Sequence, residues 1–280
     1  MNVSTYTEGV MPTGFIGGMP SEVYHSTDAI SKSGLDLIEK SPAHYKFQPP
    51  REPTPAMRIG SAIHCAILEP DRFDAEYVVA EVKTRREKAY KELVAEHGEE
   101  LVLIPSEAEA VRAIQEAALS RPEVRRLVHA PGWNELSAFA IDPETGAKVR
   151  CRYDLLAKDG FAVDIKKSRD VFPHGFSRAI ASYRYHVQVA FYSDIYYWIT
   201  GERLSEFWLI AIEDQPPYTA VPYRLDDLAI EAGRIAYRRN LNTYAHCLAS
   251  GEWPRFEPES DLITLPQWAL YEMEDQLEVA

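Results

Sequence analysis

Two acidic residues and a lysine on neighbouring predicted strands carry the strongest chemical signal in the sequence. Asp154 lies in an alternating segment, and Asp164 and Lys166 lie two residues apart in the next one. Residues two apart point to the same face of a strand, and a turn at Gly160 folds the two segments together. The two carboxylates and the ammonium group are therefore expected to converge.

This group suits metal-dependent hydrolysis of a phosphodiester. Two hard carboxylates can hold Mg²⁺, for which Mn²⁺ is expected to substitute, and the ion polarises the phosphoryl oxygen and activates water. Lys166 can orient or deprotonate that water and offset developing charge. Asp164 interrupts an otherwise apolar strand, where a buried charge needs a metal or a partner. The alternative is a structural Asp–Lys ion pair beside an unrelated Asp154.

Two predicted helices carry further polar residues. Gly60 and His64 lie in an otherwise apolar helix at 57–68, where a lone histidine is more often a core residue. Gln188 and Tyr192 lie at i, i+4 in a helix predicted over 177–200, so that their side chains share one face and could reach a phosphate or a base together.

The order of these motifs resembles the RecB-type branch of the PD-(D/E)xK nuclease superfamily. The residues within these motifs resemble those of the C-terminal nuclease domain of the RecE type, exodeoxyribonuclease VIII. This resemblance points to a phage or prophage recombination exonuclease. The resemblance covers about residues 24–270. It rests on Ser33-Gly-Leu, Ser41-Pro-Ala-His-Tyr45, Gly60-Ser-Ala-Ile-His64, Cys151-Arg-Tyr-Asp154, Val163-Asp-Ile-Lys166 and Gln188-Val-Ala-Phe-Tyr192.

The resemblance implies a role for each matching residue. Lys166 would be the catalytic lysine, and Gln188 and Tyr192 would hold DNA near the scissile phosphate. The implied metal ligands are the side chains of His64, Asp154 and Asp164 and the main-chain carbonyl of Ile165.

Two other residues each have two possible interpretations, and a third is interpreted as structural. Glu135 lies on the first predicted strand of the meander, where some superfamily members carry a carboxylate, but it also reads as a solvated edge residue. Arg152 shares a strand face with Asp154 and could contact DNA or pair with an acid. Glu69 is interpreted as structural or capping.

The cysteines argue against an iron–sulfur cluster. Relatives with a cluster carry a cysteine where this chain has Ser41, and the matching C-terminal cysteine cluster is absent. Cys65, Cys151 and Cys247 are expected to be buried free thiols in a reducing cytosol. No secretory signal or apolar stretch of membrane-spanning length occurs, so a cytoplasmic location in a bacterial host cell, away from membranes, is expected.

The predicted element order is helix, three-stranded meander, helix and strand, preceded by a helical region. This order predicts an α/β (α+β) fold, a PD-(D/E)xK restriction-endonuclease-like core with a mixed central sheet flanked by helices. We expect a flexible arm at 1–23, a single nuclease domain at 24–270 and an acidic tail at 271–280. The predicted strands are 135–141, 148–157, 161–166, 206–213 and 218–224, and the predicted helices include 57–68, 106–120, 177–200 and 226–249.

The charge distribution changes what the net charge implies. A formal net charge of -13 argues against binding a polyanion. Yet residues 256–280 hold seven acids and no Lys or Arg, whereas residues 143–184 hold nine basic and five acidic residues. The predicted site is therefore locally basic, and 83–91 is a second basic stretch that is either a solvated helix face or a DNA contact.

The leading hypothesis is a Mg²⁺-dependent exonuclease that digests linear double-stranded DNA from 5′ ends and leaves 3′ single strands for recombination. The alternatives are a structure-specific endonuclease and a non-catalytic DNA-binding protein of the same fold. The resemblance implies double-stranded DNA ends as substrate, a single-strand annealing partner of RecT type, and a ring-shaped homo-oligomer.

Overall fold

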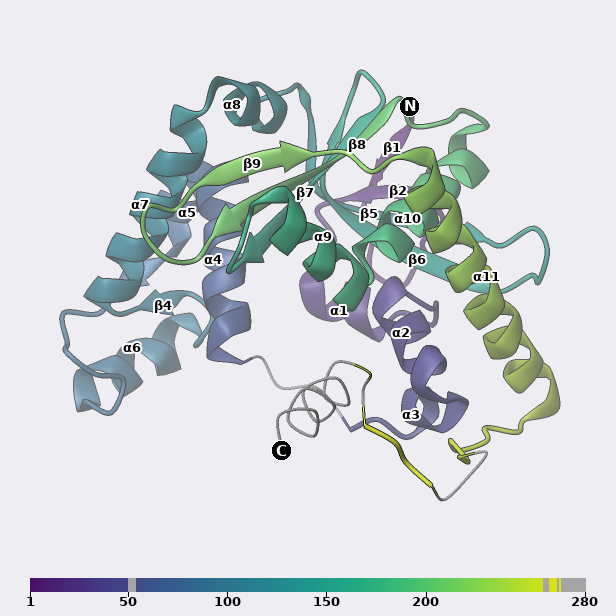
Figure 1. Ribbon diagram of the computed structural model, residues 1–280. Coiled ribbons are helices and arrows are strands. Elements are labelled where there is room, and N and C mark those ends of the chain that lie inside the picture. The colour runs from purple at the N-terminus through teal and green to yellow at the C-terminus, as the bar shows by residue number, and fades with distance from the viewer. Residues whose placement is uncertain (50–53, 259–261, 266, 268–280) are drawn as a thin grey trace, which may run out of the picture.

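The computed structural model describes residues 1–49, 54–258, 262–265 and 267, and its centre is a seven-stranded mixed sheet between two layers of helices (Figure 1). The strands lie in the sheet in the order of the chain. They are β1 (Val3–Thr5), β2 (Gly14–Gly17), β5 (Gly132–Ile141), β6 (Lys148–Ala157), β7 (Phe161–Ser168), β8 (Glu206–Glu213) and β9 (Ala220–Tyr223).

Strands β5, β6 and β7 form an antiparallel meander at the middle of the sheet. A tight turn joins β6 to β7, and Gly160 in this turn has a φ of 80°, which glycine adopts without steric cost. β7 pairs in parallel with β8, so the chain must cross over between them, and helices make that crossover. β9 then returns antiparallel to β8.

Two hydrophobic clusters fill the two faces of the sheet, each beneath its own helices (Figure 1). One face is covered by α2 (Lys32–Lys40), α9 (Pro173–Ser182), α10 (Tyr185–Thr200) and α11 (Asp227–Ser250). The other is covered by α4 (Pro55–Leu68), α5 (Pro70–Glu76), α7 (Pro105–Ser120) and α8 (Pro122–Val128). The α/β fold class with a mixed sheet flanked by helices, predicted from the sequence, is confirmed.

Smaller elements extend these layers. α6 (Lys88–His97) and the two-stranded parallel ladder of β3 (Val78–Val79) and β4 (Val102–Leu103) enclose a separate small cluster around Tyr90. α1 (Ser21–Ser26) covers the sheet beside β2, and α3 (Pro42–Lys46) follows α2. The basic stretch 83–91 leads into α6. Arg85, before the helix, pairs with Glu107 at 2.5 Å, and Lys88, the first residue of the helix, pairs with Glu92 at 3.2 Å.

The prediction of a flexible arm at 1–23 is wrong for the residues that form β1 and β2. β2 pairs with β5, placing Phe15 opposite Ala138, and the Phe15 side chain is 2% exposed in the main core. The burial of Phe15 and Ile16 stabilises a strand that is too short and too glycine-rich to be recognised locally. The predicted acidic tail at 271–280 lies outside the described residues.

The single helix predicted over 177–200 is two helices, α9 and α10. Arg184 separates them in the left-handed conformation, with a φ of 56°. Neither proline nor glycine marks this break, so the sequence offered no local signal for it. Elsewhere β6 and β8 match their predicted ranges, and the other predicted elements differ by one to three residues at their ends.

Candidate active site

Asp154 and Asp164 meet where strands β6 and β7 begin to separate. The register pairs Leu155 with Val163 and Leu156 with Ala162, which places Asp154 opposite Asp164 at the next position. The Asp154 Oδ2 accepts a hydrogen bond from the Ile165 main-chain N–H at 2.7 Å. The Asp154 carboxylate thus accepts the Ile165 N–H hydrogen bond that a main-chain carbonyl of β6 would accept in a regular sheet. This bond fixes the Asp154 side chain against β7.

Asp164 is closed in by two partners. The Lys166 Nζ lies 2.5 Å from Asp164 Oδ2, and the Gln188 Nε2 on α10 donates to Asp164 Oδ1 at 2.5 Å. Burial lowers the pKa of Lys166, but the attraction of Asp164 and Asp154 more than offsets it, so that the net shift is upward. Lys166 is therefore held as a cation against an acid that is 3% exposed.

His64 reaches Asp154 from helix α4. The Thr54 hydroxyl caps the helix by accepting from the Met57 N–H at 3.3 Å, and the apolar face around Ile63 and Ile67 is buried against the sheet. His64 keeps 29% of its side chain exposed, with Nδ1 3.3 Å from Asp154 Oδ2. The helix thus presents one imidazole to the strand acids rather than burying it in the core.

Glu135 joins this group from strand β5. The register of β5 with β6 pairs Asn134 with Leu155 and Leu136 with Tyr153, so Glu135 faces Asp154 between them. Glu135 has a φ of 48°, a conformation that costs a non-glycine residue free energy and that clusters at functional sites. Ligand atoms of His64, Glu135 and Asp154 lie within 4.8 Å of one another.

The alternation of side chains slips by one residue at this point. On β6, Tyr153 and Leu156 belong to the core cluster beneath α10, whereas Leu155 and Ala157 belong to the cluster beneath α4. Strict alternation would place Tyr153 and Leu155 on the same face. Asp154 lies at this break in the alternation, and its carboxylate, together with that of Glu135, is close to the His64 imidazole of α4.

The electrostatics favour a cation beside Asp154. Burial, followed by the neighbouring Asp164, raises the pKa of Asp154 to about 7, although His64 and Lys166 act in the opposite direction. Burial also raises the pKa of Glu135. Clustered buried acids with raised pKa values are relieved by a divalent ion, because the ion favours their charged forms.

Gln188 and Tyr192 lie on α10, one turn apart. Gln188 is 7% exposed, and its amide nitrogen donates a hydrogen bond to Asp164. The Tyr192 ring packs edge-on against the Tyr153 ring with centroids 5.4 Å apart, and burial raises its pKa well above the ordinary value. The structure brings both residues to the site, while their contact with DNA stays a prediction.

Arg152 is engaged within the protein. Its guanidinium donates to the Ser137 hydroxyl at 3.0 Å and to the Met19 carbonyl at 2.9 Å, and it lies 4.3 Å from the centre of the Tyr24 ring. These contacts anchor the N-terminal segment to β6. Contact of Arg152 with DNA stays a prediction.

Two other residues that the sequence singled out have defined surroundings. Ile165 lies between Asp164 and Lys166, with its N–H bound to Asp154, and the ligand role of its carbonyl stays a prediction. Glu69 caps the C-terminal end of α4 and pairs with Arg72 at 3.0 Å, consistent with a structural role.

Sequence reasoning missed Tyr185 at the start of α10. The Lys166 ammonium lies 4.7 Å from the centre of the Tyr185 ring, so the aromatic face covers the lysine. Tyr185 fell inside a helix predicted to be continuous, and nothing in its spacing separated it from a core aromatic residue.

A family model described as "PDDEXK-like domain of unknown function (DUF3799)" matches residues 31–264. The chain belongs to this PDDEXK-like family. The match includes β5, β6 and β7 and every residue of the group built around Asp154 and Asp164. A nuclease-type fold is thereby established, and the family supports a nuclease.

A solved structure shows the same fold for the PDDEXK-like domain. A protein named "Putative exonuclease" from Eubacterium rectale superposes with a TM-score of 0.60 at 15% identity, covering 89% of this chain and 95% of that chain. A phage related exonuclease from Haemophilus somnus 129PT gives a TM-score of 0.31 at 10% identity, covering 65% and 94%. A search of curated proteins finds no match.

The donor set of the PDDEXK-like domain fits a divalent metal ion. His64 offers an imidazole nitrogen and Glu135 and Asp154 offer carboxylate oxygens, a mixture that Mn²⁺ accepts and that oxygen-preferring Mg²⁺ accepts with water completing its shell. The raised pKa of Asp154 is a second sign, because such an acid gains from a nearby cation. Asp164, held by Lys166, lies on the next strand as the predicted further ligand.

Two remaining sequence expectations concern thiols and membranes. Cys65, Cys151 and Cys247 are each buried and free. Among the residues that the structure describes, no helix is both long and apolar enough to cross a membrane.

Proposed function

We propose that this domain is a Mg²⁺-dependent exonuclease that digests linear double-stranded DNA in the 5′-to-3′ direction and leaves 3′ single strands. The observation that carries the proposal is the convergence of His64, Glu135 and Asp154 beside the Asp164–Lys166 pair. Three potential ligands next to a largely buried lysine supply what phosphodiester hydrolysis requires.

The residues divide the chemistry between them. A bound divalent ion would supply Lewis-acid polarisation of the phosphate and a more acidic water. His64, Glu135 and Asp154 would hold it, with Asp164 at the adjoining position. Lys166, cationic and fixed by Asp164, lies where it can orient the attacking water and offset charge on the phosphoryl oxygens.

Gln188 holds Asp164 in place for this work. Its amide donates to Asp164 Oδ1, and Lys166 binds the other oxygen of the same carboxylate. With both oxygens engaged, the side chain has little rotational freedom, so the lysine is held in one position. Such placement lowers the barrier because no reorganisation is needed during the reaction.

Substrate polarity and partners rest on the resemblance to RecE-type nucleases. The recombination role, the annealing partner of RecT type, the ring-shaped homo-oligomer and the bacterial cytoplasm belong to this proposal on that support alone. The "Putative exonuclease" that shares the fold carries a name that agrees with exonuclease activity.

Digestion of an end-labelled linear duplex tests the proposal. With Mg²⁺, the 5′ label should be released first as a mononucleotide or short product, while a 3′ label stays on a shortening strand. Cleavage of closed circular duplex would instead establish an endonuclease. Binding without any cleavage, with Mg²⁺ or with Mn²⁺, would establish a non-catalytic DNA-binding protein.

A further inference from the structure

A pair of stacked tyrosines lies at the turn between α9 and α10. Tyr183 is the C-cap residue of α9 and Tyr185 begins α10, and their rings stack with centroids 5.6 Å apart and planes 23° apart. The two rings differ in environment. Tyr185 is half-buried, whereas Tyr183 is 63% exposed.

The stack begins at the proposed catalytic lysine. The Tyr185 ring lies under the Lys166 ammonium at 4.7 Å, and it also packs on Phe176 with centroids 6.2 Å apart. Tyr183 stacks on Tyr185 and faces solvent. Aromatic surface therefore extends from Lys166 to the outside of the protein.

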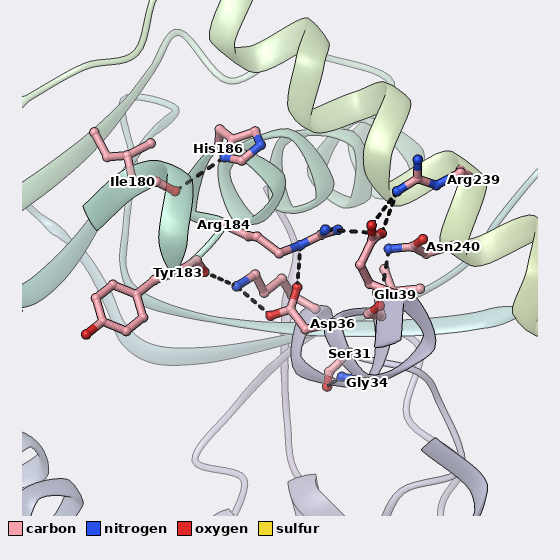
Figure 2. A network of polar contacts seen from close by, with 12 residues as sticks. Ser31, Gly34, Asp36, Glu39, Ile180, Tyr183, Arg184, His186, Arg239 and Asn240 are labelled. Atoms are coloured by element: carbon pink, nitrogen blue, oxygen red, sulfur yellow. Dashed lines mark hydrogen bonds and ion pairs between the residues drawn. The ribbon is translucent and has the colours of Figure 1, made fainter. Parts of the chain in front are cut away.

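Ion pairs from α2 hold the turn in its conformation (Figure 2). Arg184, between the two tyrosines, adopts a left-handed φ of 56° that an L-residue rarely takes without support. Its guanidinium binds Asp36 at 2.9 Å and Glu39 at 3.1 Å. Lys32 donates to the Tyr183 carbonyl at 2.6 Å and pairs with Asp36 at 2.7 Å.

This support fixes the backbone on both sides of the exposed ring. Figure 2 shows the Tyr183 ring directed away from the ion-pair network, so the network holds the main chain and leaves the outer face of the ring accessible. A rigid, exposed aromatic ring binds a flat ligand with little loss of conformational entropy. The cations of Lys166, Lys32 and Arg184 lie around the base of the stack, and each is paired with an acid, so the stack offers a flat aromatic surface rather than an excess of positive charge.

A nucleobase is a flat ligand of this kind, and in DNA its phosphate would bring it to the proposed catalytic lysine. Base–aromatic stacking is tolerant of sequence because every base has a π-face. In a duplex both faces of a base are covered by its neighbours, so only a terminal or unpaired base can stack on a protein ring.

We propose that Tyr183 stacks on one unpaired nucleobase of the DNA strand whose phosphate reaches Lys166. This inference rests on the proposed function and adds to it a requirement: at least one nucleotide must leave the duplex stack beside the cleavage position. Tyr185 transmits the position of the base to the lysine, because its ring contacts both Tyr183 and Lys166.

Binding of fluorescent oligonucleotides tests the stacking directly. Duplexes with a frayed end carrying 2-aminopurine would be titrated with the full-length protein in Ca²⁺, which prevents cleavage and separates binding from chemistry. For Tyr183→Ala we expect a Kd increase of roughly tenfold and loss of the 2-aminopurine quenching. Tyr183→Phe should keep both, since the ring remains.

Tyr197 provides the matched control. It is also an exposed tyrosine on α10, 46% exposed, but lies twelve residues beyond Tyr185, about 18 Å along the helix. Tyr197→Ala should leave the Kd and the quenching unchanged. An equal loss in Tyr197→Ala and Tyr183→Ala would overturn the proposal.

A scan with abasic nucleotides locates the stacked base. At one position near the scissile phosphate, removal of the base should weaken binding to the wild type but have no further effect on Tyr183→Ala, because the same contact is already lost. Independent losses at every position would refute base stacking. A change in oligomeric state of Tyr183→Ala, measured by light scattering, would instead show that a second copy of the chain covers the ring.

Failure of this inference can be told apart from failure of the proposed function. Quenching that depends on Tyr183, without cleavage in Mg²⁺, would keep the stacking site and remove the nuclease. Cleavage that is unaffected by Tyr183→Ala, on intact and abasic ends alike, would keep the nuclease and remove the stacking site.

Discussion

Asp154 and Asp164 lie opposite each other on neighbouring strands, yet their surroundings differ in kind. Asp164 has a lysine on one oxygen and an amide on the other. Asp154 has a main-chain N–H and a histidine, with Glu135 close by. One carboxylate is balanced by the protein's own cation, whereas the other is placed among acids that an external cation would balance.

The difference shows how the lysine of the site can be held in position before a metal ion binds. The Asp164–Lys166 pair fixes the proposed catalytic lysine without help from a ligand, while the unfavourable charge on the Asp154 side is relieved by a proton or by a bound metal ion. If Asp154 and Asp164 belong to two separate units, a metal-binding unit and a lysine-holding unit, changes to each should have different effects on turnover, stability and metal binding.

The largest effect concerns turnover, which requires both units. Lys166→Ala and Asp154→Asn should each lower the single-turnover rate of duplex digestion by at least about a thousandfold. The double variant should be little slower than either single variant, since both remove the same reaction. Lys167→Ala is the control, because Lys167 is exposed beside the site and pairs with Asp214 at 3.8 Å. A Lys166→Ala protein that keeps a tenth of the wild-type rate would remove the lysine from the mechanism.

Stability in metal-free buffer should separate the two acids. Asp164→Ala leaves Lys166 as a largely buried cation without its acid, and breaking such a pair costs about 3–5 kcal/mol. Asp154→Asn should be neutral or stabilising, because it removes an acid from an acidic cluster. Urea unfolding in EDTA at pH 8 measures both, and equal losses would contradict the distinction.

Metal binding should depend on pH through Asp154. The folded pKa of about 7 lies above the unfolded value, so the metal-free protein is most stable below the unfolded pKa and loses that stability as pH rises toward 7. Binding of Mn²⁺ must release this proton, and its affinity should therefore fall up to about tenfold per unit below pH 7. Calorimetry between pH 5.5 and 8 tests this, and a flat affinity would show that Asp154 is already ionised.

The smallest effects are expected for the two supporting residues, Glu135 beside Asp154 and Gln188 beside Asp164. Glu135→Gln should weaken Mn²⁺ binding several-fold by removing a ligand charge. Gln188→Leu should leave Mn²⁺ binding intact and lower turnover by about tenfold, because the amide that holds Asp164 is lost. Reversal of the two phenotypes would show that the metal lies on the Asp164 side.

The sequence was sufficient for the parts of the site that follow strict periodicity. β6 and β8 have their predicted ends, and Asp154, Asp164 and Lys166 converge as their alternation predicts. Period-two patterning predicts β6 well because Arg150, Arg152 and Asp154 are partly exposed and alternate with buried apolar residues.

Non-local features could not be predicted. β2 exists through pairing with β5, more than a hundred residues later in the chain, and β1 in turn pairs with β2. The distortion at Glu135 and the left-handed Arg184 are stabilised by tertiary contacts, and no glycine marks either position. The open reading of Glu135 therefore remained undecided until the register placed it opposite Asp154.

The order of strands along the sheet has a consequence for how the protein folds. Glu135, Asp154 and Asp164 all come from the meander β5–β6–β7, whose contacts are local in sequence and are therefore closed quickly. Gln188 follows on α10, 24 residues after Asp164, whereas His64 lies on α4, separated from β5 by helices α5 to α8. A refolding chain would gather its acids first and acquire the histidine later, so the competence to bind metal would report the docking of α4 rather than the formation of the sheet.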